Sequence, residues 1–459
     1  MQTFDVIIIG GGPGGYLAAE RIGHAGLTTL LIEKHKVGGV CLNEGCIPSK
    51  IFLNSAKIMD STKEAHQFGV HLKQSEPSAL DINFLVKRKN KIVNNLVTGV
   101  GAQLKKNNVL TVKNEAKIIG KDQNGFVVEA GNESFSGKRL MIATGSRPIV
   151  PFAIQGVKEN YEKGFVLTSS QIFDIEKIPS SLVVIGAGII GLEMASFFNS
   201  VGTQVTVIEM QNSIAGETDS KISKIIQKSF EKSGIKFYLG SKLTKIKDNS
   251  VIWEKDGKSQ ELETDKVLLA IGRRPNIEGF GLEKIGVQIE RNAIVTDSKM
   301  KTNIQNVYAI GDVNGLSMLA HTAYREAEVA VNNILGKKDE MKYDSIPSVI
   351  FTHPEVASVG LTEESAKHKG LDIKVLELPL AYSGRYMAEN EDLNGICRIV
   401  VNLKTNTLIG AHIIGSYAGE YIVLLSSLIN LEVDVENIKK LVFPHPTVSE
   451  IIRETIWTL

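Results

Sequence analysis

The stretch that decides the fold is "FDVIIIGGGPGGYLAAERIGHAGLTTLLIE", residues 4–33. An apolar run typical of a buried parallel strand leads into glycines in G-x-G-x-x-G spacing, a helical stretch and a second apolar run ending in an acid. The first glycine permits a tight turn, the second lets a pyrophosphate approach the backbone, and the third lets helix and strand lie close together. The helix N-terminus favours the phosphate and the acid binds a ribose hydroxyl. The stretch therefore predicts a dinucleotide-binding unit with contacts from Gly10, Gly12, Gly15 and Glu33.

The same pattern occurs a second time, in "LVVIGAGIIGLEMASFFNSVGTQVTVIE", residues 182–209. Its glycines have the same spacing, and its final acid again follows the last glycine by 18 residues. We therefore expect a second dinucleotide site built from Gly186, Gly188, Gly191 and Glu209.

Two shorter stretches also echo each other, "LMIATGSRP" (140–148) and "LLAIGRRP" (268–275). Each reads as a strand that runs into a glycine turn, at Gly145 and Gly272, and then an Arg-Pro pair. The first closes a βαβ region before the second glycine pattern, and the second closes one after it. We include both glycines among the expected cofactor-binding positions.

A third strand signal, "NVYAIGDV" (306–313), indicates where the first unit resumes. It is an apolar strand leading to Asp312, an acid placed to hold a ribityl or ribose hydroxyl, and it lies beyond the second glycine pattern. We therefore expect an α/β protein in which the second Rossmann-like unit is inserted into the first. The predicted regions are 1–149 and 270–340 for the flavin domain, 150–269 for the nicotinamide domain, and 341–459 for a C-terminal α+β interface domain.

Two dinucleotides in one chain imply electron transfer between a tightly held flavin, FAD, and a diffusible nicotinamide. The second site also predicts its nucleotide. Glu209 favours a free 2′-hydroxyl and repels a 2′-phosphate, and the following loop, "MQNSIAGETD" (210–219), has no Arg or Lys to hold that phosphate. NAD is therefore expected rather than NADP.

Composition narrows the function classes. The 459 residues are 43% hydrophobic and 22% charged, as in globular proteins, and the formal net charge of +1 argues against a nucleic-acid or membrane-binding surface. No apolar run approaches the roughly 18 residues of a membrane span, and the start lacks the basic region of a signal peptide. Three cysteines in so long a chain are typical of a reducing compartment, so we expect a cytoplasmic location.

Two of those cysteines stand together in "GGVCLNEGCIPSK", residues 38–50. Pro48 marks the first turn of a helix, so Cys46 is expected at a helix N-terminus, where the helix dipole stabilises a thiolate. Cys41 is expected in the preceding turn, close enough for a disulfide. A short-loop disulfide stabilises little and is better suited to redox exchange. Lys50 lies one turn further along the helix and can reach a flavin ring.

The cysteine pair has two other interpretations. The pair can be two buried reduced thiols, or it can bind zinc. Zinc is disfavoured because no further Cys or His flanks the pair at ligand spacing, so no metal is expected.

The end of the chain, "FPHPTVSEIIRETIWTL", offers a proton acceptor. His445 is the natural candidate base for thiol–disulfide exchange, since imidazole titrates near neutrality. Glu450, five residues on, can fix its tautomer. By itself such a pair is a weak signal.

Taken together, these motifs resemble the pyridine nucleotide–disulfide oxidoreductases of class I, and within them the branch of the dihydrolipoamide dehydrogenases. The resemblance spans essentially the whole chain. It rests on the cysteine motif and on "ATGSRP", "GAGIIGLE", "AIGRRPN", "VYAIGDV", "MLAHTA", "IPSVIFTHPEVASVGLT" and "HPTVSE".

The resemblance implies roles that spacing does not show. Cys41 attacks the substrate and Cys46 faces the flavin. His445 and Glu450 act on the partner's cysteines, so the chain is expected to be a homodimer with shared active sites. Glu193 is expected to pair with Lys50 near the flavin. The resemblance further implies flavin contacts from Ala320 and His321.

The implied reaction is the oxidation of dihydrolipoamide by NAD+ to lipoamide and NADH, through the redox-active disulfide and FAD. The implied partners are lipoyl domains, or the lipoyl carrier, of a 2-oxoacid dehydrogenase or glycine cleavage complex. The alternatives are another NADH-dependent disulfide reductase of the family and a structural subunit of a multienzyme complex. Glu44, where the family has a small apolar residue, is expected to disfavour nearby thiolates.

Overall fold

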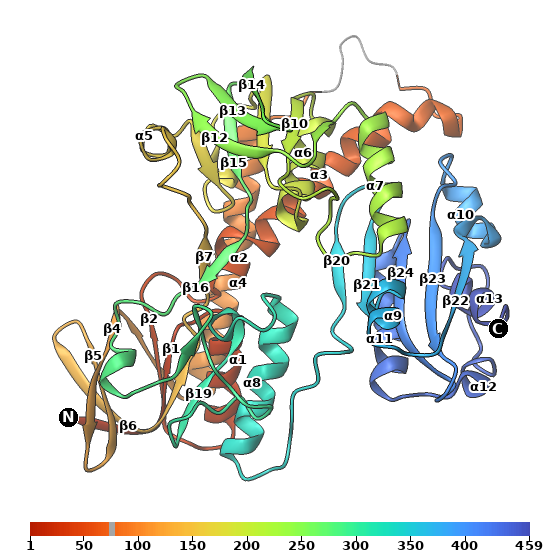
Figure 1. Cartoon of the computed structure of the whole chain (residues 1–459). Helices are drawn as coiled ribbons and strands as arrows, with labels where there is room; N and C mark the ends of the chain where they lie inside the picture. Colours follow the sequence, from red (N-terminus) through yellow and green to blue (C-terminus); the bar gives the residue numbers. More distant parts are fainter. Residues whose placement is uncertain (73–78) are drawn as a thin grey trace.

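The computed structural model describes residues 1–72 and 79–459, and Figure 1 shows three regions. The strand before the first glycines is buried on both faces, because Val6, Ile7 and Ile8 are each 0% exposed. It forms the middle of a seven-stranded sheet in the order β3-β2-β1-β6-β5-β4, with β19 paired to β6. The strands are β1 (Gln2–Ile9), β2 (Thr29–Glu33), β3 (Val109–Lys113), β4 (Ala116–Asp122), β5 (Gly125–Ala130), β6 (Glu133–Ile142) and β19 (Val307–Ala309).

The first sheet has a parallel half and an antiparallel half. Strands β3, β2, β1, β6 and β19 are mutually parallel, whereas β5 runs antiparallel to both of its neighbours, β4 and β6. Because β19 comes after the whole second unit in the sequence, the second unit is an insertion into the first, as predicted. The exact domain limits stay a prediction.

Helices from distant parts of the chain accompany this sheet. The helix after the first glycines packs beside a helix that follows β19. The two cysteines lie in a further pair of helices, which are followed by a long one. These helices are α1 (Pro13–His24), α8 (Ala320–Ile334), α2 (Gly39–Glu44), α3 (Cys46–Glu64) and α4 (Ile82–Lys106).

The inserted unit has its own parallel sheet, in the order β11-β10-β9-β15-β8, and an antiparallel β12-β13-β14 sheet beside it. Helix α6 (Ile189–Ser200) follows the second glycine pattern and packs on α3, where Phe52 and Phe197 lie with ring centroids 5.0 Å apart. The remaining elements are α5 (Val157–Glu162), β8 (Val166–Thr168), β9 (Ser181–Ile185), β10 (Gln204–Ile208), α7 (Ser220–Lys232), β11 (Lys236–Tyr238), β12 (Lys242–Ile246), β13 (Ser250–Lys255), β14 (Lys258–Glu263) and β15 (Lys266–Leu269).

The two Arg-Pro stretches join the first two regions. They form β7 (Ser146–Pro148) and β16 (Arg273–Pro275), which pair antiparallel with each other. Their similarity in sequence therefore corresponds to a shared place in the fold, because the chain leaves the first unit along one strand and returns along the other.

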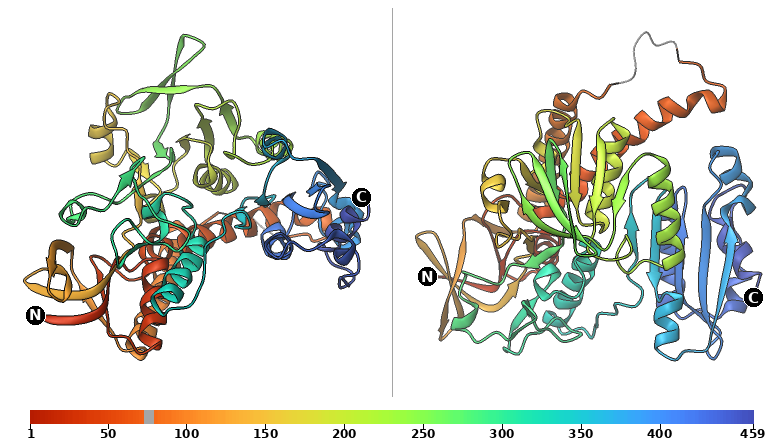
Figure 2. Two further views of the ribbon diagram at one scale, coloured as in Figure 1. Left: turned by 60° about the horizontal axis from the view of Figure 1, so that its bottom comes forward. Right: turned by 45° about the horizontal axis from the view of Figure 1, so that its top comes forward.

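The C-terminal region is an antiparallel sheet with helices around it, in the strand order β20-β21-β24-β23-β22. In Figures 1 and 2, α7 of the inserted unit stands beside this sheet. The elements are β20 (Ser348–Ile350), β21 (Val356–Gly360), α9 (Glu363–His368), β22 (Ile373–Pro379), α10 (Gly384–Glu389), β23 (Ile396–Asn402), β24 (Thr407–Ile414), α11 (Ala418–Asn430), α12 (Val435–Ile438) and α13 (Glu450–Ile456).

Two local predictions differ from the structure. Cys41 lies inside the short helix α2 rather than in a turn, because Gly38 in the left-handed conformation starts a helical turn there. The strand β19 ends at Ala309, and Asp312 lies in a 3₁₀ turn, Gly311–Asn314, rather than at the strand end. In residues 1–72 and 79–459, no helix is both long and apolar enough to cross a membrane.

Candidate active site

One cavity of about 2440 Å³ runs through the first two regions and reaches the third. Both glycine patterns line it, as do both cysteines, so the predicted redox pair and the two predicted dinucleotide sites open into the same space. Predicted site residues along its wall are Gly10, Gly12, Glu33, Cys41, Cys46, Lys50, Gly145, Gly186, Gly188, Glu193, Glu209, Gly272, Asp312, Ala320 and His321.

The first glycine of each pattern is required by the protein backbone itself. Gly10 and Gly186 share a φ of +103°, in the left-handed region that other residues avoid. A Cβ on Gly10 would lie 2.2 Å from the Ala143 carbonyl oxygen, and one on Gly186 would lie 2.5 Å from the Ala270 oxygen. The two turns are thus built in the same way.

The third glycine is required by helix packing in both units. A Cβ on Gly15 would lie 1.8 Å from the carbonyl oxygen of Gly10, and one on Gly191 would lie 2.1 Å from that of Gly186. Neither glycine can be replaced without moving its helix away from its strand.

The middle glycine has a different reason. Gly12 and Gly188 have ordinary extended backbones, with φ of −70° and −76°. A Cβ on Gly12 would have its nearest neighbour at 3.9 Å, and one on Gly188 would meet no heavy atom of the described chain within 4 Å. Each precedes a helix N-terminus that has no side-chain cap. An open cradle in front of free N–H groups fits the pyrophosphate of a dinucleotide at both places.

The acids at the two strand ends are also held in the same way. Glu33 accepts hydrogen bonds of 2.7 Å from the backbone N–H groups of Gly11 and His35. Glu209 accepts bonds of the same length from Ala187 and Gln211, at the equivalent positions of the second unit. Each carboxylate is therefore held against its glycine turn, where a ribose would lie.

Asp312 is fixed by a network that the sequence did not predict. It accepts a hydrogen bond from the Ser146 hydroxyl, to which Arg273 donates from Nε at 2.8 Å. Burial lowers the pKa of Arg273, and the nearby charges of Asp312, Glu44 and Cys46 oppose that shift. Glu44 therefore lies within the electrostatic reach of Arg273. In the sequence, the only indication of a role for Arg273 is its place in "AIGRRP".

The N-terminus of α8 faces the same cavity with Ala320 and His321. The His321 ring is held by its Nε2, which lies 2.7 Å from the Pro347 carbonyl oxygen. Further along the helix, the fully buried Glu326 accepts a hydrogen bond of 2.6 Å from the Gly311 N–H, next to Asp312. Sequence reasoning missed Glu326, since a single acid in a helix gives no signal of what it holds.

The two cysteines are neighbours at the start of the helix pair. Cys46 is the first residue of α3, as predicted, and both sulfurs are free thiols in this structure. A hydrogen bond from the Cys41 thiol lowers the pKa of Cys46, and the Lys50 ammonium contributes to this shift. The same hydrogen bond, together with burial, raises the pKa of Cys41. Cys46 is therefore the favoured thiolate of the pair.

Lys50 is held in place from both sides. Its Nζ lies 2.9 Å from Glu193 Oε1 on α6 and 4.1 Å from the ring centroid of Phe351. Glu193 is 4% exposed and also accepts a hydrogen bond of 3.1 Å from the Phe351 N–H. All three regions of the chain thus meet at this ammonium.

Two phenols beside the cysteines were also missed. Tyr16 on α1 and Tyr324 on α8 share a hydrogen bond of 2.5 Å, and burial raises the pKa of both. Charges on Cys41 and Cys46 raise the pKa values of both tyrosines further, so the phenols lie within electrostatic reach of the sulfurs. Two tyrosines so far apart in sequence give no signal that they pair.

His445 and Glu450 are brought together, but away from the cysteines of their own chain. His445 Nδ1 lies 2.9 Å from Glu450 Oε1, and Glu450 also accepts a hydrogen bond of 2.8 Å from the Thr447 N–H. Although partial burial raises it, the pKa of Glu450 is lowered on balance by these two partners. The His445 side chain is 80% exposed and is absent from the described residues that line the cavity.

Comparison with known proteins agrees with this geometry. Residues 4–327 match the family described as pyridine nucleotide-disulphide oxidoreductase, and residues 346–456 match its dimerisation domain. Two similar curated proteins are the dihydrolipoyl dehydrogenases of Rhizobium etli and Mycoplasma pneumoniae. Each is 37% identical to this chain, and each alignment covers 99% of this chain and 98% of the relative.

Solved structures share the fold over the full length. LpdA from Mycobacterium tuberculosis superposes with a TM-score of 0.90 at 23% identity, covering 100% of this chain and 99% of that one. The HOCl-induced flavoprotein disulfide reductase RclA from Escherichia coli gives 0.85 at 26% identity, with 99% of each chain covered. With two paired glycine patterns, adjacent cysteines and full-length relatives, the chain belongs to the pyridine nucleotide–disulphide oxidoreductase family.

Proposed function

We propose that the chain is an FAD-dependent enzyme that oxidises dihydrolipoyl groups with NAD+, yielding lipoyl groups and NADH. The observation that carries the proposal is the single cavity that joins two dinucleotide cradles to a cysteine pair. Full-length relatives named dihydrolipoyl dehydrogenase support the substrate. FAD, when bound at the first cradle, accepts two electrons from the cysteine dithiol and supplies hydride to NAD+.

The two cysteines have different tasks in the oxidised enzyme. A dihydrolipoyl thiolate attacks the Cys41 sulfur of the Cys41–Cys46 disulfide, forming a mixed disulfide with Cys41 and releasing Cys46 as a thiolate. A leaving thiol of low pKa departs faster, and the Lys50 ammonium, which helps to lower the pKa of Cys46, therefore favours this direction of attack. The second substrate thiol then attacks the substrate sulfur of the mixed disulfide, which closes the lipoyl ring and leaves Cys41 reduced.

The exchange needs a base, because each substrate thiol must lose its proton before it attacks. His445 has a free Nε2 when Glu450 holds its Nδ1, and its exposure leaves it accessible to a second subunit. In the proposed homodimer, His445 of the partner subunit accepts the proton beside Cys41. The match of residues 346–456 to a dimerisation domain supports this assembly.

Each cofactor is assigned to one cradle from the residues that surround that cradle. Gly10, Gly12, Gly15, Glu33 and Asp312 are proposed to hold FAD together with the α8 N-terminus, and Lys50 to lie near its reacting end. The second cradle, with Glu209, is proposed to take NAD+ rather than NADP+, since the 210–219 loop has no cationic side chain. We further infer lipoyl domains or lipoyl carriers as macromolecular partners and a reducing, cytoplasmic setting.

The direct test is a steady-state assay of the purified, FAD-containing protein with dihydrolipoamide and NAD+, following NADH formation. Turnover that requires both substrates supports the proposal, and NADP+ in place of NAD+ serves as the matched control. A chain that binds FAD but gives no NADH from dihydrolipoamide would contradict it.

A second candidate, reduction of another disulfide by NADH, is favoured by the likeness to the disulfide reductase RclA. The same preparation distinguishes the two. If NADH is consumed faster with other small disulfides than with lipoamide, the chain is a reductase of that kind and the lipoyl assignment is wrong.

A further inference from the structure

The loop 210–219, between β10 and α7, forms one wall of the proposed nicotinamide nucleotide site. It follows Glu209, and Met210, Gln211, Ser213, Gly216 and Glu217 line the cavity. Near its middle the loop is tied to the glycine turn, because the Ala215 N–H donates to the Ala187 carbonyl oxygen at 2.8 Å. This bond couples the loop to the turn whose Ala187 N–H holds Glu209.

The far end of the loop is anchored at Asp219, which is 1% exposed. One carboxylate oxygen caps α7 by accepting hydrogen bonds from the backbone N–H groups of Lys221 and Ile222, at 3.0 and 3.3 Å. The other oxygen forms an ion pair with Arg398 Nε at 3.2 Å, without hydrogen-bond geometry. Arg398 does not belong to the inserted unit, since it projects from β23 of the C-terminal sheet.

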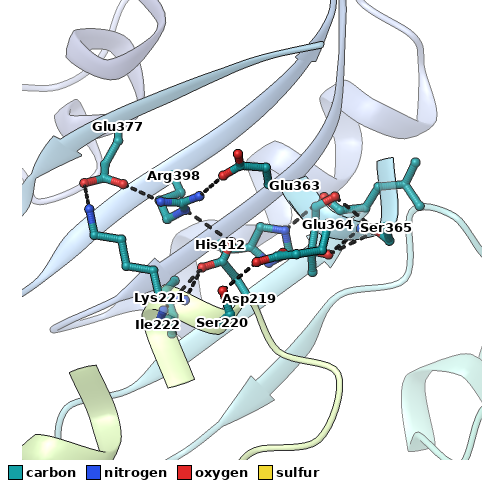
Figure 3. Close-up of polar contacts among 12 residues, drawn as sticks. Asp219, Ser220, Lys221, Ile222, Glu363, Glu364, Ser365, Glu377, Arg398 and His412 are labelled. Atoms are coloured by element: carbon teal, nitrogen blue, oxygen red, sulfur yellow. Dashed lines mark hydrogen bonds and ion pairs between the residues drawn. The ribbon is translucent and has the colours of Figure 1, made fainter. Parts of the chain in front are cut away.

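Arg398 is the centre of the contact between these two regions, as Figure 3 shows. Its side chain is 9% exposed and binds three carboxylates. Besides Asp219, these are Glu363 at 2.7 Å and Glu377 at 2.5 Å. The two residues after Asp219 reach across as well. Ser220 donates to Glu364 at 2.5 Å, and the Lys221 ammonium contacts Glu377.

The charges make Arg398 the central cation of this contact. Three carboxylates, on Asp219, Glu363 and Glu377, converge on Arg398 and Lys221, and the one on Asp219 is buried. A planar guanidinium can hold several carboxylates at once, whereas an ammonium acts as a single point charge. Without Arg398, Asp219 would face Glu363 and Glu377 with no buried cation between them, and the loop end would move away.

We propose that Arg398 is a positioning residue for the pyridine nucleotide: it pins the loop 210–219 to the C-terminal sheet and thereby maintains the nucleotide site in the inserted unit. The inference rests on the proposed function, because it assumes that the second cradle takes NAD(H). It makes nucleotide affinity depend on a residue of the dimerisation region that touches neither nucleotide nor cysteine.

The test is the binding of NADH to the flavin-containing protein, followed by the fluorescence of the nucleotide. Arg398→Met should raise the Kd for NADH by about three- to thirtyfold. The KM for dihydrolipoamide and the flavin content should stay within about twofold of the unmodified protein, and Arg398→Lys should recover part of the affinity. The matched control is Arg385→Met, which removes an exposed arginine of the same region whose partner, Glu389, lies on its own helix.

An unchanged Kd in a folded Arg398→Met protein, or an equal loss in Arg385→Met, would overturn the inference. If Arg398→Met does not fold, the Kd for NADH is measured on Asp219→Asn instead. Asparagine still caps α7 but has no charge to pair with Arg398. An unchanged Kd in Asp219→Asn then overturns the inference, and a raised one supports it. Failure of the unmodified protein to bind NADH would instead contradict the proposed function.

Discussion

The two dinucleotide units are nearly identical at their glycine turns and differ in what surrounds them. Both have the same φ at the first glycine, the same open space at the second and the same 2.7 Å bonds to the final acid. The first unit adds the cysteine helices, Asp312 and the α8 N-terminus, which come from sequence on both sides of the insertion. The second adds a loop tied to the C-terminal sheet.

The difference indicates how one motif serves two purposes. Around the first cradle, distant segments close on the ligand, as expected for a cofactor that stays bound during turnover. Around the second, the loop 210–219 of the inserted unit itself forms one wall, as expected for a nucleotide that must enter and leave in each cycle. We therefore infer that the glycine pattern fixes the kind of ligand, and that the surrounding elements determine whether the ligand exchanges.

The largest expected effect is a loss of turnover that leaves FAD and NADH binding at the two cradles intact. Cys46→Ser should lower turnover with dihydrolipoamide by about 10⁴-fold or more, because no disulfide can form. FAD content and NADH affinity should be retained, since the glycine turns and their acids do not involve the thiol. Flavin content of the purified variant and NADH titration check this, and loss of FAD from a folded variant would show that the first cradle depends on the cysteine.

A substitution of the proposed base, His445, should also leave dinucleotide binding at both cradles intact. His445→Gln should lower kcat by about 10²–10⁴-fold, because it removes the general base while leaving Glu450 in place. Mixing this chain with a Cys41→Ser chain and allowing subunits to exchange should restore about a quarter of the activity. Random pairing makes half of the dimers mixed, and each of these has one complete site out of two. No recovery despite demonstrated exchange would place the base in its own chain.

The middle glycines offer a matched pair that sharpens the comparison. Gly188→Ala should raise the Kd for NADH by about 5- to 150-fold, because the methyl group occupies the cradle. Thermal stability should be unchanged, since the backbone is ordinary and the space is open. Gly12→Ala should instead weaken FAD binding. If Gly188→Ala alters flavin content and leaves NADH affinity intact, the two cradles have been assigned the wrong way round.

The smallest expected effect concerns nucleotide choice at the second cradle. Replacing Glu209 by Ala and Gln211 by Arg should shift the ratio of kcat/KM for NAD+ over NADP+ by about tenfold toward NADP+, as a charge-assisted bond to the 2′-phosphate is gained. Steady-state rates with both nucleotides measure the shift. An unmodified protein that already prefers NADPH would show that Glu209 does not select the nucleotide.

Much of this arrangement follows from local sequence. The glycines, the terminal acids and the helix start at Cys46 are governed by backbone geometry within one βαβ unit, and the strand at 307–309 shows where the first unit resumes. The contact between Lys50 and Glu193 came only from the family resemblance, because 143 residues separate them. Spacing alone carries no information about such a pair.

What could not be predicted depends on side chains that meet across regions. Nothing near Arg398 indicates Asp219, and an arginine in the apolar strand "CRIVV" reads as an ordinary surface position. Arg273 and Glu326 were missed for the same reason, since each stabilises a functional segment through a neighbour. The effect of Glu44 on the thiolates stays a prediction, and Lys50 and Glu193 are the charged side chains of other segments that influence the pKa of Cys46.

The central claim is that electrons pass from a dithiol substrate through Cys41 and Cys46 to the nucleotide at the second cradle. Counting thiols in the denatured protein tests it most directly, because the chain has three cysteines and Cys397 is buried apart from the pair. The oxidised, FAD-containing protein should show one thiol per chain. After anaerobic treatment with dihydrolipoamide and removal of the substrate it should show three, and NAD+ should return the count to one. A count that dihydrolipoamide does not change, or that NAD+ does not reverse, would contradict the account.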